Sequence, residues 1–501
     1  MSKDIPIQIG SRREVFWDDY LVLQTDAVLT QHKPQDHGVA MVCDAPWEGS
    51  SCVYPVVIRE RELVRLYYKA GNFNISADTK PGDPLTGPMV ICCAESSDDG
   101  KTFHKPSYGI HDCQGSKDNN IILVKSDEIK NTDNFAVFRD TNPDCPEDER
   151  YKATLDNGRV AEGSYDRILT WLKSKDGIHF APGGEVIRGG WFDSMNCAFW
   201  DRHTSQYYLY MRDWPEGYDR DRGEGISRKK RDIRYAVSPD FRNWTQPQRV
   251  DFDVDDAVEL YTNNVKPYHR SDHLYFGLAT RYVERGGWSK SFDYLPCPDN
   301  RRNRSSLQMR YGTALTDCVL ITSRDGVHFK RWNEAFMTPG IERGNNWAYG
   351  DCYFSWGMVE TPSDLPDMAP NELSFYAFDG MWTKDCSLRR YAIRKDGLIS
   401  YKAPLKGATL TTKTFIYEGS RLMLNFATSA VGHVYVSILD DAGAEIPGYQ
   451  SHEVFGDSLD RPVVFADGPD VSSLAGRPIR LKFTLRDADL YAFQFVKPDF
   501  T

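Results

Sequence analysis

A short phrase recurs five times along the chain: a small or basic residue, then Asp-Gly or a close variant, then an aromatic residue. The copies cover residues 96–103, 174–180, 238–244, 323–329 and 394–401. Asp-Gly favours a tight hairpin, because Gly adopts positive φ at little cost and Asp hydrogen-bonds the turn backbone. The aromatic residue begins a strand and can fill the gap between neighbouring sheets. Recurrence every 64 to 85 residues predicts a repeat architecture of the β-propeller kind.

Each phrase ends a unit of short alternating strands, and helical periodicity is almost absent. The first strands of the units are expected at residues 52–57, 135–138, 197–200, 264–268 and 354–358. Five units predict five blades. Asp18–Val22 is expected to add a strand near the start that completes the last blade. The sequence therefore predicts an all-β fold, with a five-bladed β-propeller over residues 1–403.

The pattern changes around Pro404 to Gly407. Six alternating segments follow, without Cys or Trp, and predict a C-terminal β-sandwich over residues 404–501. Two Gly/Arg/Asp-rich insertions, residues 215–231 and 282–310, are too long for ordinary hairpin loops. The second is interpreted either as a lid over the propeller mouth or as a surface or subunit-contact segment.

Composition restricts the partners. The net charge of −11 argues against nucleic acid or an anionic membrane surface as the main partner. Eleven Cys residues without zinc-type spacing predict buried free thiols in a reducing compartment. With no apolar span of 18 residues and no leader-like N-terminus, a cytoplasmic protein is expected, or a secreted one whose leader has been removed.

Polar residues precede the first strand of each unit. In a propeller these strands line the central channel, so residues at their starts converge. Carboxylates from several blades would supply the acid and base of glycoside hydrolysis. The candidate catalytic residues are Glu48, Asp193 and Glu259. Candidate sugar-binding residues, chosen as aromatic rings or hydrogen-bonding groups, are Trp47, Asn134, Asn196, Arg212, Tyr261, Asn263 and Trp347. Asp18, Asp19 and Asp133 are the next candidates, and Asp140 is interpreted as a turn cap.

A family resemblance rests on residues 16–22, 46–49, 140–143, 261–263 and 487–491. With the five-unit pattern, these segments resemble the invertase/levanase family and its arabinanase/xylosidase relatives, most closely their uncharacterised bacterial relatives. The resemblance covers nearly the whole chain. It implies that Glu48 takes the place of the family's nucleophile, Asp193 that of its transition-state stabiliser and Glu259 that of its acid. All three motifs depart from the family pattern: Glu48 stands where the family has Asp, Asp193 lacks a preceding Arg, and Leu260 replaces a Cys.

The resulting hypothesis is a glycoside hydrolase that releases terminal sugars from an oligo- or polysaccharide by a carboxylate acid/base mechanism. A non-catalytic carbohydrate-binding propeller is one alternative. A glycoside phosphorylase is another, with Arg212, Arg281 and Arg310 binding phosphate. No cofactor is expected to be required, and no metal ligands are assigned. A structural Ca²⁺ in the channel, a homo-oligomer, the sugar, the linkage and the stereochemistry are left open.

Overall fold

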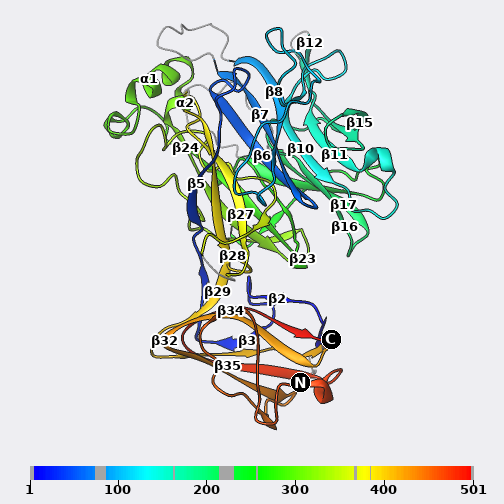
Figure 1. Cartoon of the computed structure of the whole chain (residues 1–501), viewed down its shortest axis with the longest axis vertical. Helices are drawn as coiled ribbons and strands as arrows, with labels where there is room; N and C mark the ends of the chain where they lie inside the picture. The colour runs from blue at the N-terminus through cyan, green and yellow to red at the C-terminus, as the bar shows by residue number, and fades with distance from the viewer. Residues whose placement is uncertain are drawn as a thin grey trace.

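The computed structural model describes residues 5–73, 86–161, 164–213, 231–254, 258–365, 369–383 and 385–497. Five sheets surround a common axis, and a further sheet lies at one end of them (Figure 1). The predicted five-bladed all-β propeller is confirmed.

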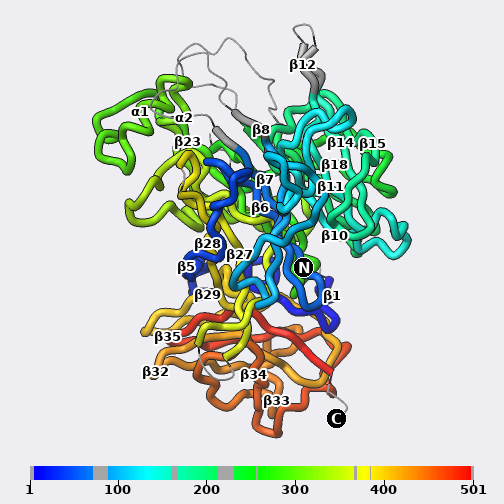
Figure 2. The backbone as a smooth tube through the Cα atoms, turned by 45° about the horizontal axis from the view of Figure 1, so that its top comes forward, coloured from blue at the N-terminus to red at the C-terminus, as the bar shows by residue number. Residues whose placement is uncertain are grey.

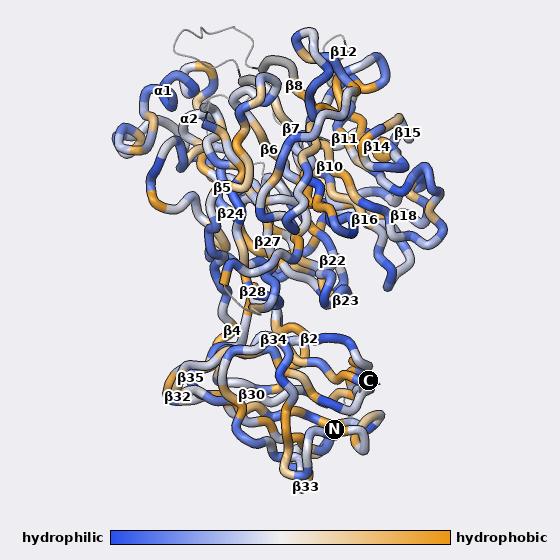
Figure 3. The backbone as a smooth tube through the Cα atoms, in the orientation of Figure 1, coloured by the Kyte–Doolittle hydropathy of each residue, from blue (hydrophilic) through white to orange (hydrophobic). Residues whose placement is uncertain are grey.

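The first three blades are consecutive four-stranded antiparallel sheets. Apolar residues are concentrated in the strands of these blades, and polar residues in the loops that connect them (Figure 3). The strands are β6 (Ser51–Glu60), β7 (Leu63–Phe73), β8 (Thr86–Ser96) and β9 (Ile121–Leu123); β10 (Asp133–Arg139), β11 (Tyr151–Asp156), β14 (Ile168–Ser174) and β15 (Ala181–Arg188); and β16 (Cys197–Asp201), β17 (Gln206–Asp213), β18 (Asp232–Ser238) and β19 (Gln248–Arg249). Blade 2 also carries the 3-10 turn η1 (Glu147–Glu149) and the hairpin β12 (Arg159–Ala161) and β13 (Ser164–Asp166).

Blade 4 contains the second insertion. Its sheet comprises β20 (Asp251–Phe252), β21 (Glu259–Leu260), β22 (Lys266–Tyr268), β23 (Ser271–Glu284), β24 (Ala314–Ser323) and β25 (His328–Arg331). Between β23 and β24 the chain forms η2 (Lys290–Asp293), α1 (Pro298–Leu307) and α2 (Met309–Thr313), which the sequence pattern did not predict. Arg301 and Arg304 of α1 are fully buried, so this segment is a packed unit. The first insertion lies outside the described residues except for Arg231.

Blade 5 is closed by the N-terminal part of the chain. It comprises β26 (Val359–Thr361), β27 (Glu372–Asp379), β28 (Ser387–Arg394) and β5 (Gln35–Val42). Strand β5 pairs with β28 from Ser387↔Val42 to Ala392↔Gln35. The prediction that Asp18–Val22 completes this blade is therefore wrong, because the closing strand lies further along the chain.

The repeated hairpins have the expected turn chemistry. In the first copy, Ser96 Oγ donates to Asp98 Oδ1 at 2.6 Å and Gly100 N–H donates back to Ser96 Oγ at 2.8 Å. The same Ser–Asp bond recurs in three further copies, at Ser174–Asp176, Ser238–Asp240 and Ser323–Asp325. The fifth copy has no such Ser and differs in its connection too: it leads from β28 into the C-terminal sheet.

These hairpins also hold neighbouring blades together. Tyr376 of blade 5 donates to Gly100 O of blade 1, and Tyr210 of blade 3 donates to Gly326 O of blade 4, both at 2.6 Å. A Cβ at Gly100 would lie 2.4 Å from Tyr376 Oη, and one at Gly326 would lie 2.6 Å from Tyr210 Oη. Gly is required there by this close approach as well as by its positive φ.

The C-terminal domain is one 11-stranded sheet folded over a shared apolar core. The long strands β32 and β35 pair along both halves, with a register shift between Thr428 and His433 where the sheet bends. Both layers of the predicted sandwich thus belong to one hydrogen-bonded sheet. Its elements are β1 (Ile7–Gly10), β2 (Glu14–Val15), β3 (Val22–Thr25), β4 (Val28–Gln31), β29 (Ile399–Ala403), β30 (Ala408–Thr412), β31 (Phe415–Tyr417), β32 (Arg421–Asp440), β33 (Glu445–Gln450), β34 (Asp457–Pro462), η3 (Ser472–Leu474) and β35 (Ile479–Val496).

The expected division into residues 1–403 and 404–501 needs correction at both ends of the propeller. Strands β1 to β4 and β29 pair within the C-terminal sheet, and the N-terminal segment lies against that domain (Figure 2). The reason is burial of Ile9, Phe16 and Leu21 in its core.

Candidate active site

The two ends of the propeller are distinguished by the C-terminal sheet. Strand β28 runs toward that sheet and continues into β29, and the first strands of the blades run the same way (Figure 1). The starts of the first strands therefore lie at the end away from the C-terminal sheet, the far end. Their last residues lie at the near end.

Two of the three predicted carboxylates belong to one charged cluster at the far end. Asp193 forms an ion pair with Arg212 and lies 4.0 Å from Arg167. Glu259 pairs with Arg231 at 2.5 Å. The guanidinium carbons of Arg212 and Arg231 lie 5.7 and 5.3 Å from the centroid of the Tyr261 ring. Tyr261 thus connects the two ion pairs.

Burial and the neighbouring charge affect the arginines of this cluster. Arg212 is almost fully buried. Burial, and after it the charge of Arg231, lowers the pKa of Arg212 to about 10. Both cations remain protonated at neutral pH, because even this lowered pKa lies well above 7. They can therefore counter carboxylates or an anionic group of a substrate.

Tyrosines surround these ion pairs. Tyr349 Oη donates to Tyr261 Oη at 2.8 Å, and the Tyr353 ring stacks on Tyr261 at 5.5 Å. Arg310, from α2, lies 5.7 Å from the Tyr349 ring. Tyr282 Oη and Tyr353 Oη are buried and form no hydrogen bond within the described part of the chain. Apolar ring faces beside hydroxyl and guanidinium groups suit the mixed surface of a sugar.

A second pair of carboxylates lies in blade 2, and the sequence analysis had selected only one of them. Asp133 opens β10 directly opposite Asp156 in β11. Lys69 of blade 1 forms an ion pair with Asp133, whose side chain is 36% exposed. Burial raises the pKa of Asp156 above its ordinary value and the Asp133 charge raises it further, while Gly158 N–H, Arg167 and Arg212 lower it. Those arginines connect this pair electrostatically to Asp193.

Glu48 does not share this environment. Its side chain is fully buried. One carboxylate oxygen accepts from Tyr68 Oη at 2.6 Å, and the other accepts from Ala45 N–H at 2.9 Å and from Lys105 Nζ at 2.7 Å. These contacts give Glu48 a structural role, and none of them joins it to Asp193 or Glu259. Trp47 beside it donates to Asn120 Oδ1 at 2.9 Å.

The predicted amides mainly shape the loops before the first strands. Asn134 and Asn196 both donate to Phe192 O, at 3.3 and 2.9 Å. Asn263 donates to Met195 O and Tyr210 O at 3.0 and 3.2 Å. Asn196 Oδ1 is buried and accepts no bond from the described residues. Trp347 donates to Gly340 O at 2.9 Å, in a loop of blade 5.

The remaining candidates lie elsewhere. Asp18 pairs with Arg324 through both oxygens, at 2.6 and 3.1 Å, at the near end, so it is no alternative base for the far-end cluster. Asp140 accepts from Asn142 N–H at 2.8 Å, the capping bond that the sequence predicts, and pairs with Lys152. Arg281 is held by Asp317 at 2.8 and 2.5 Å.

One group of side chains has the spacing of a metal site within the described residues. The sulfur atoms of Cys43, Cys52 and Cys386 lie within 4.8 Å of one another, buried where β5, β6 and β28 meet. Backbone oxygens accept from two of the thiols, Cys52 to Glu48 O and Cys386 to Cys52 O. Sulfur donors do not suit Ca²⁺, which takes oxygen ligands. The cysteines of the described chain are free thiols, as predicted; eight of them are buried, whereas Cys113 and Cys145 are partly buried and Cys297 is exposed.

Comparisons with known proteins give distant structural matches. No family model and no curated protein sequence matches the chain. A Bombyx mori GH32 beta-fructofuranosidase is 10% identical with a TM-score of 0.40, over 92% of this chain and 94% of that one. A Penicillium chrysogenum alpha-L-arabinanase complexed with arabinobiose is 11% identical, over 73% and 100%, with a TM-score of 0.38. An F. plautii N-acetylgalactosamine deacetylase is 12% identical, over 76% and 94%, with a TM-score of 0.37.

At these identities and TM-scores the matches carry no argument about the reaction. The candidate site therefore depends on its own geometry. None of the described helices is long and apolar enough to span a membrane.

Proposed function

We propose that this protein is a glycoside hydrolase that cleaves terminal sugars from an acidic oligo- or polysaccharide at the far end of the propeller. The observation that supports it is the convergence of four carboxyl groups from three blades: Asp133, Asp156, Asp193 and Glu259. Glycosidic bond cleavage needs a protonated and an ionised carboxyl group on either side of the bond.

The two more exposed acids of this cluster are the ones that a substrate could reach. Asp193 and Asp133 have half-exposed and 36% exposed side chains and come from neighbouring blades. We assign them as the acid/base pair. Asp156 and Glu259 are more buried and tune the charge of that pair. Tyr261, Tyr282 and Tyr353 supply ring faces and hydroxyl groups for the sugar.

The arginines favour a substrate with a negative group. Arg310 reaches the cluster against the rings of Tyr311 and Tyr349, at 5.1 and 5.7 Å, and has no carboxylate partner among the described residues. A guanidinium in this setting matches the planar carboxylate of a uronic acid. Arg310→Met should raise KM for an acidic glycan and leave that for a neutral one unchanged.

The test is sugar release from acidic and neutral oligosaccharides by the full chain, with and without inorganic phosphate. Asp193→Asn and Asp133→Asn should each lower kcat about 10²–10⁴-fold while the fold is retained. A requirement for phosphate would make the protein a phosphorylase instead. Binding of the oligosaccharides without release of any sugar would make it a carbohydrate-binding propeller.

A further inference from the structure

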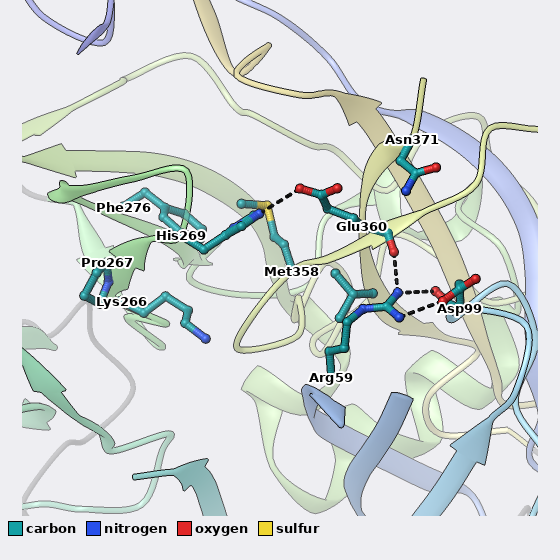
Figure 4. Close-up of a pocket in the computed structure, with 10 residues that line it drawn as sticks. Arg59, Asp99, Lys266, Pro267, His269, Phe276, Met358, Glu360 and Asn371 are labelled. Carbon is teal, nitrogen blue, oxygen red and sulfur yellow. Dashed lines mark hydrogen bonds and ion pairs between the residues drawn. The ribbon is translucent and has the colours of Figure 1, made fainter. Parts of the chain in front are cut away.

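The near end of the propeller contains two adjoining cavities of about 490 and 390 Å³. Arg59, Lys266, Pro267, His269 and Met358 line both. Arg59, Lys266 and Pro267 belong to the first strands of blades 1 and 4, whereas His269 follows β22 and Met358 precedes β26; Figure 4 shows them around one space. First-strand residues of blades 1 to 4 line the second cavity, which therefore lies in the channel at the near end. Each volume is in the range of small-molecule sites.

The walls of the second cavity are largely apolar. They include aliphatic and aromatic side chains from blades 1, 2, 3 and 5, namely Val56, Val57, Ile58, Val137, Phe138, Phe199, Trp200, Trp356 and Met358. Such walls cover a hydrophobic body and make any charge within them expensive unless it is paired.

The first strand of blade 4 is divided into β21 and β22, and Lys266 lies in β22, the part toward the near end. Its amine lies among these apolar side chains. Nζ lies 5.7 Å from the centroid of the Trp356 ring. Its ammonium has no hydrogen bond or ion pair with any described residue, and no dashed line reaches it in Figure 4. Burial lowers the pKa of Lys266, as expected for an ammonium without a counter-charge.

The carboxylates of the lining have partners of their own. Arg59 pairs with Asp99 at 2.6 Å, and Glu360 accepts from His269 at 3.3 Å and pairs with Lys395 (Figure 4 shows the first two). Asp272 pairs with Arg202 and His203. Asp201, a buried acid of the same lining, accepts from Tyr275 Oη at 2.7 Å and from Thr204 Oγ1 at 2.8 Å. The carboxylates of the lining are therefore held by groups other than Lys266, whose ammonium has no counter-charge among the described residues.

We propose that the near-end cavity binds a small organic anion, with its charged group on Lys266 Nζ and its apolar body against Trp356 and Phe138. This site would be separate from the far-end cluster and independent of the proposed reaction. The Trp356 ring face, which already contacts the ammonium, would cover one side of the bound molecule.

The experiment uses fluorescence of 1-anilinonaphthalene-8-sulfonate, an amphipathic anion, titrated into the full chain. Lys266→Met should weaken binding at least tenfold, whereas Lys266→Arg should keep most of it. Lys402→Met, which removes an exposed lysine of β29, is the matched control and should change nothing. Neutral N-phenyl-1-naphthylamine should bind the wild type and Lys266→Met alike, and benzoate should compete with the sulfonate.

Equal affinity of wild type and Lys266→Met for the sulfonate would overturn the proposal, as would no binding at all. If Lys266→Met does not fold, a second measurement on the wild type tests the proposal. Trinitrobenzenesulfonate modifies lysine amines, and mass spectrometry identifies which lysines have reacted. Saturating benzoate should slow modification of Lys266 at least fivefold and leave that of Lys402 unchanged. Unchanged modification of Lys266 would also contradict the proposal.

Discussion

The two ends of the propeller channel use charge in opposite ways. At the far end, carboxylates and arginines are interleaved around Tyr261, and ion pairs join them across blades. At the near end, ion pairs neutralise the rim and one ammonium, that of Lys266, faces apolar walls. The difference follows from the strands. Loops before a strand tolerate polar residues, whereas strand interiors must be apolar to fill the space between blades.

The first prediction concerns the acids of the far end. It distinguishes Glu48, which stabilises the fold, from Asp193 and Asp133, which are assigned to catalysis. Glu48→Gln removes the charge that faces Lys105 in a fully buried position. Loss of one partner of a buried pair should lower the free energy of unfolding by about 3 kcal/mol. Urea denaturation measures this, and kcat per folded molecule should stay within about twofold of the wild type.

Asp44→Asn is the matched control, because Asp44 contacts the same lysine with a side chain that is mostly exposed. It should cost less than about 1 kcal/mol. A Glu48→Gln protein of unchanged stability whose kcat fell a hundredfold would return Glu48 to the catalytic set and contradict its placement here.

Most of the fold was predictable from the sequence, because turn chemistry is local. The Ser-x-Asp-Gly phrases carry their own hydrogen bonds, so each marks a hairpin wherever it occurs. The closing strand β5 was not predictable. Its partner β28 lies about 350 residues later, and the segment Gln35–Val42 has only a weak alternating pattern.

The site was predictable in part for a related reason. The sequence pattern of a carboxylate before a strand is the same for Asp193, which pairs with Arg212 and is half-exposed, and for Glu48, which is buried against Lys105. The distinction depends on Tyr68 and Lys105, which approach from later segments. Asp156 was missed because its importance arises from strand register opposite Asp133, which composition and spacing do not show.

The second prediction concerns a buried acid at the far end. Burial raises the pKa of Asp351 to about 7 from an ordinary 3.8, and Arg301 and Arg304 only partly oppose this. Because the folded state favours the protonated form, this group contributes stability below pH 4 that is lost as pH rises through 7. Asp351→Asn keeps an acceptor for Ala348 N–H and should gain up to about 4 kcal/mol relative to wild type between pH 4 and pH 8. The measurement is urea denaturation of both proteins at pH 4 and pH 8. An equal loss of unfolding free energy in wild type and variant between the two pH values would contradict the prediction.

The last prediction addresses a paired acid at the near end, where the sign is opposite and the effect small. The hydrogen bond from His269, followed by the contact with Lys395, lowers the pKa of Glu360 to about 2. Its stabilisation is therefore present above pH 4.5 and is lost as pH falls toward 2. Since Glu360 is partly exposed, solvent screening limits the loss in Glu360→Gln to about 1 kcal/mol or less at pH 7. The variant and wild type should converge in stability as pH falls to about 2, measured by urea denaturation. Glu360→Gln also removes a negative charge from the lining of the near-end cavity, so it should tighten binding of the sulfonate probe about twofold. Weaker binding would contradict the assignment of Lys266 as the group that binds the anion.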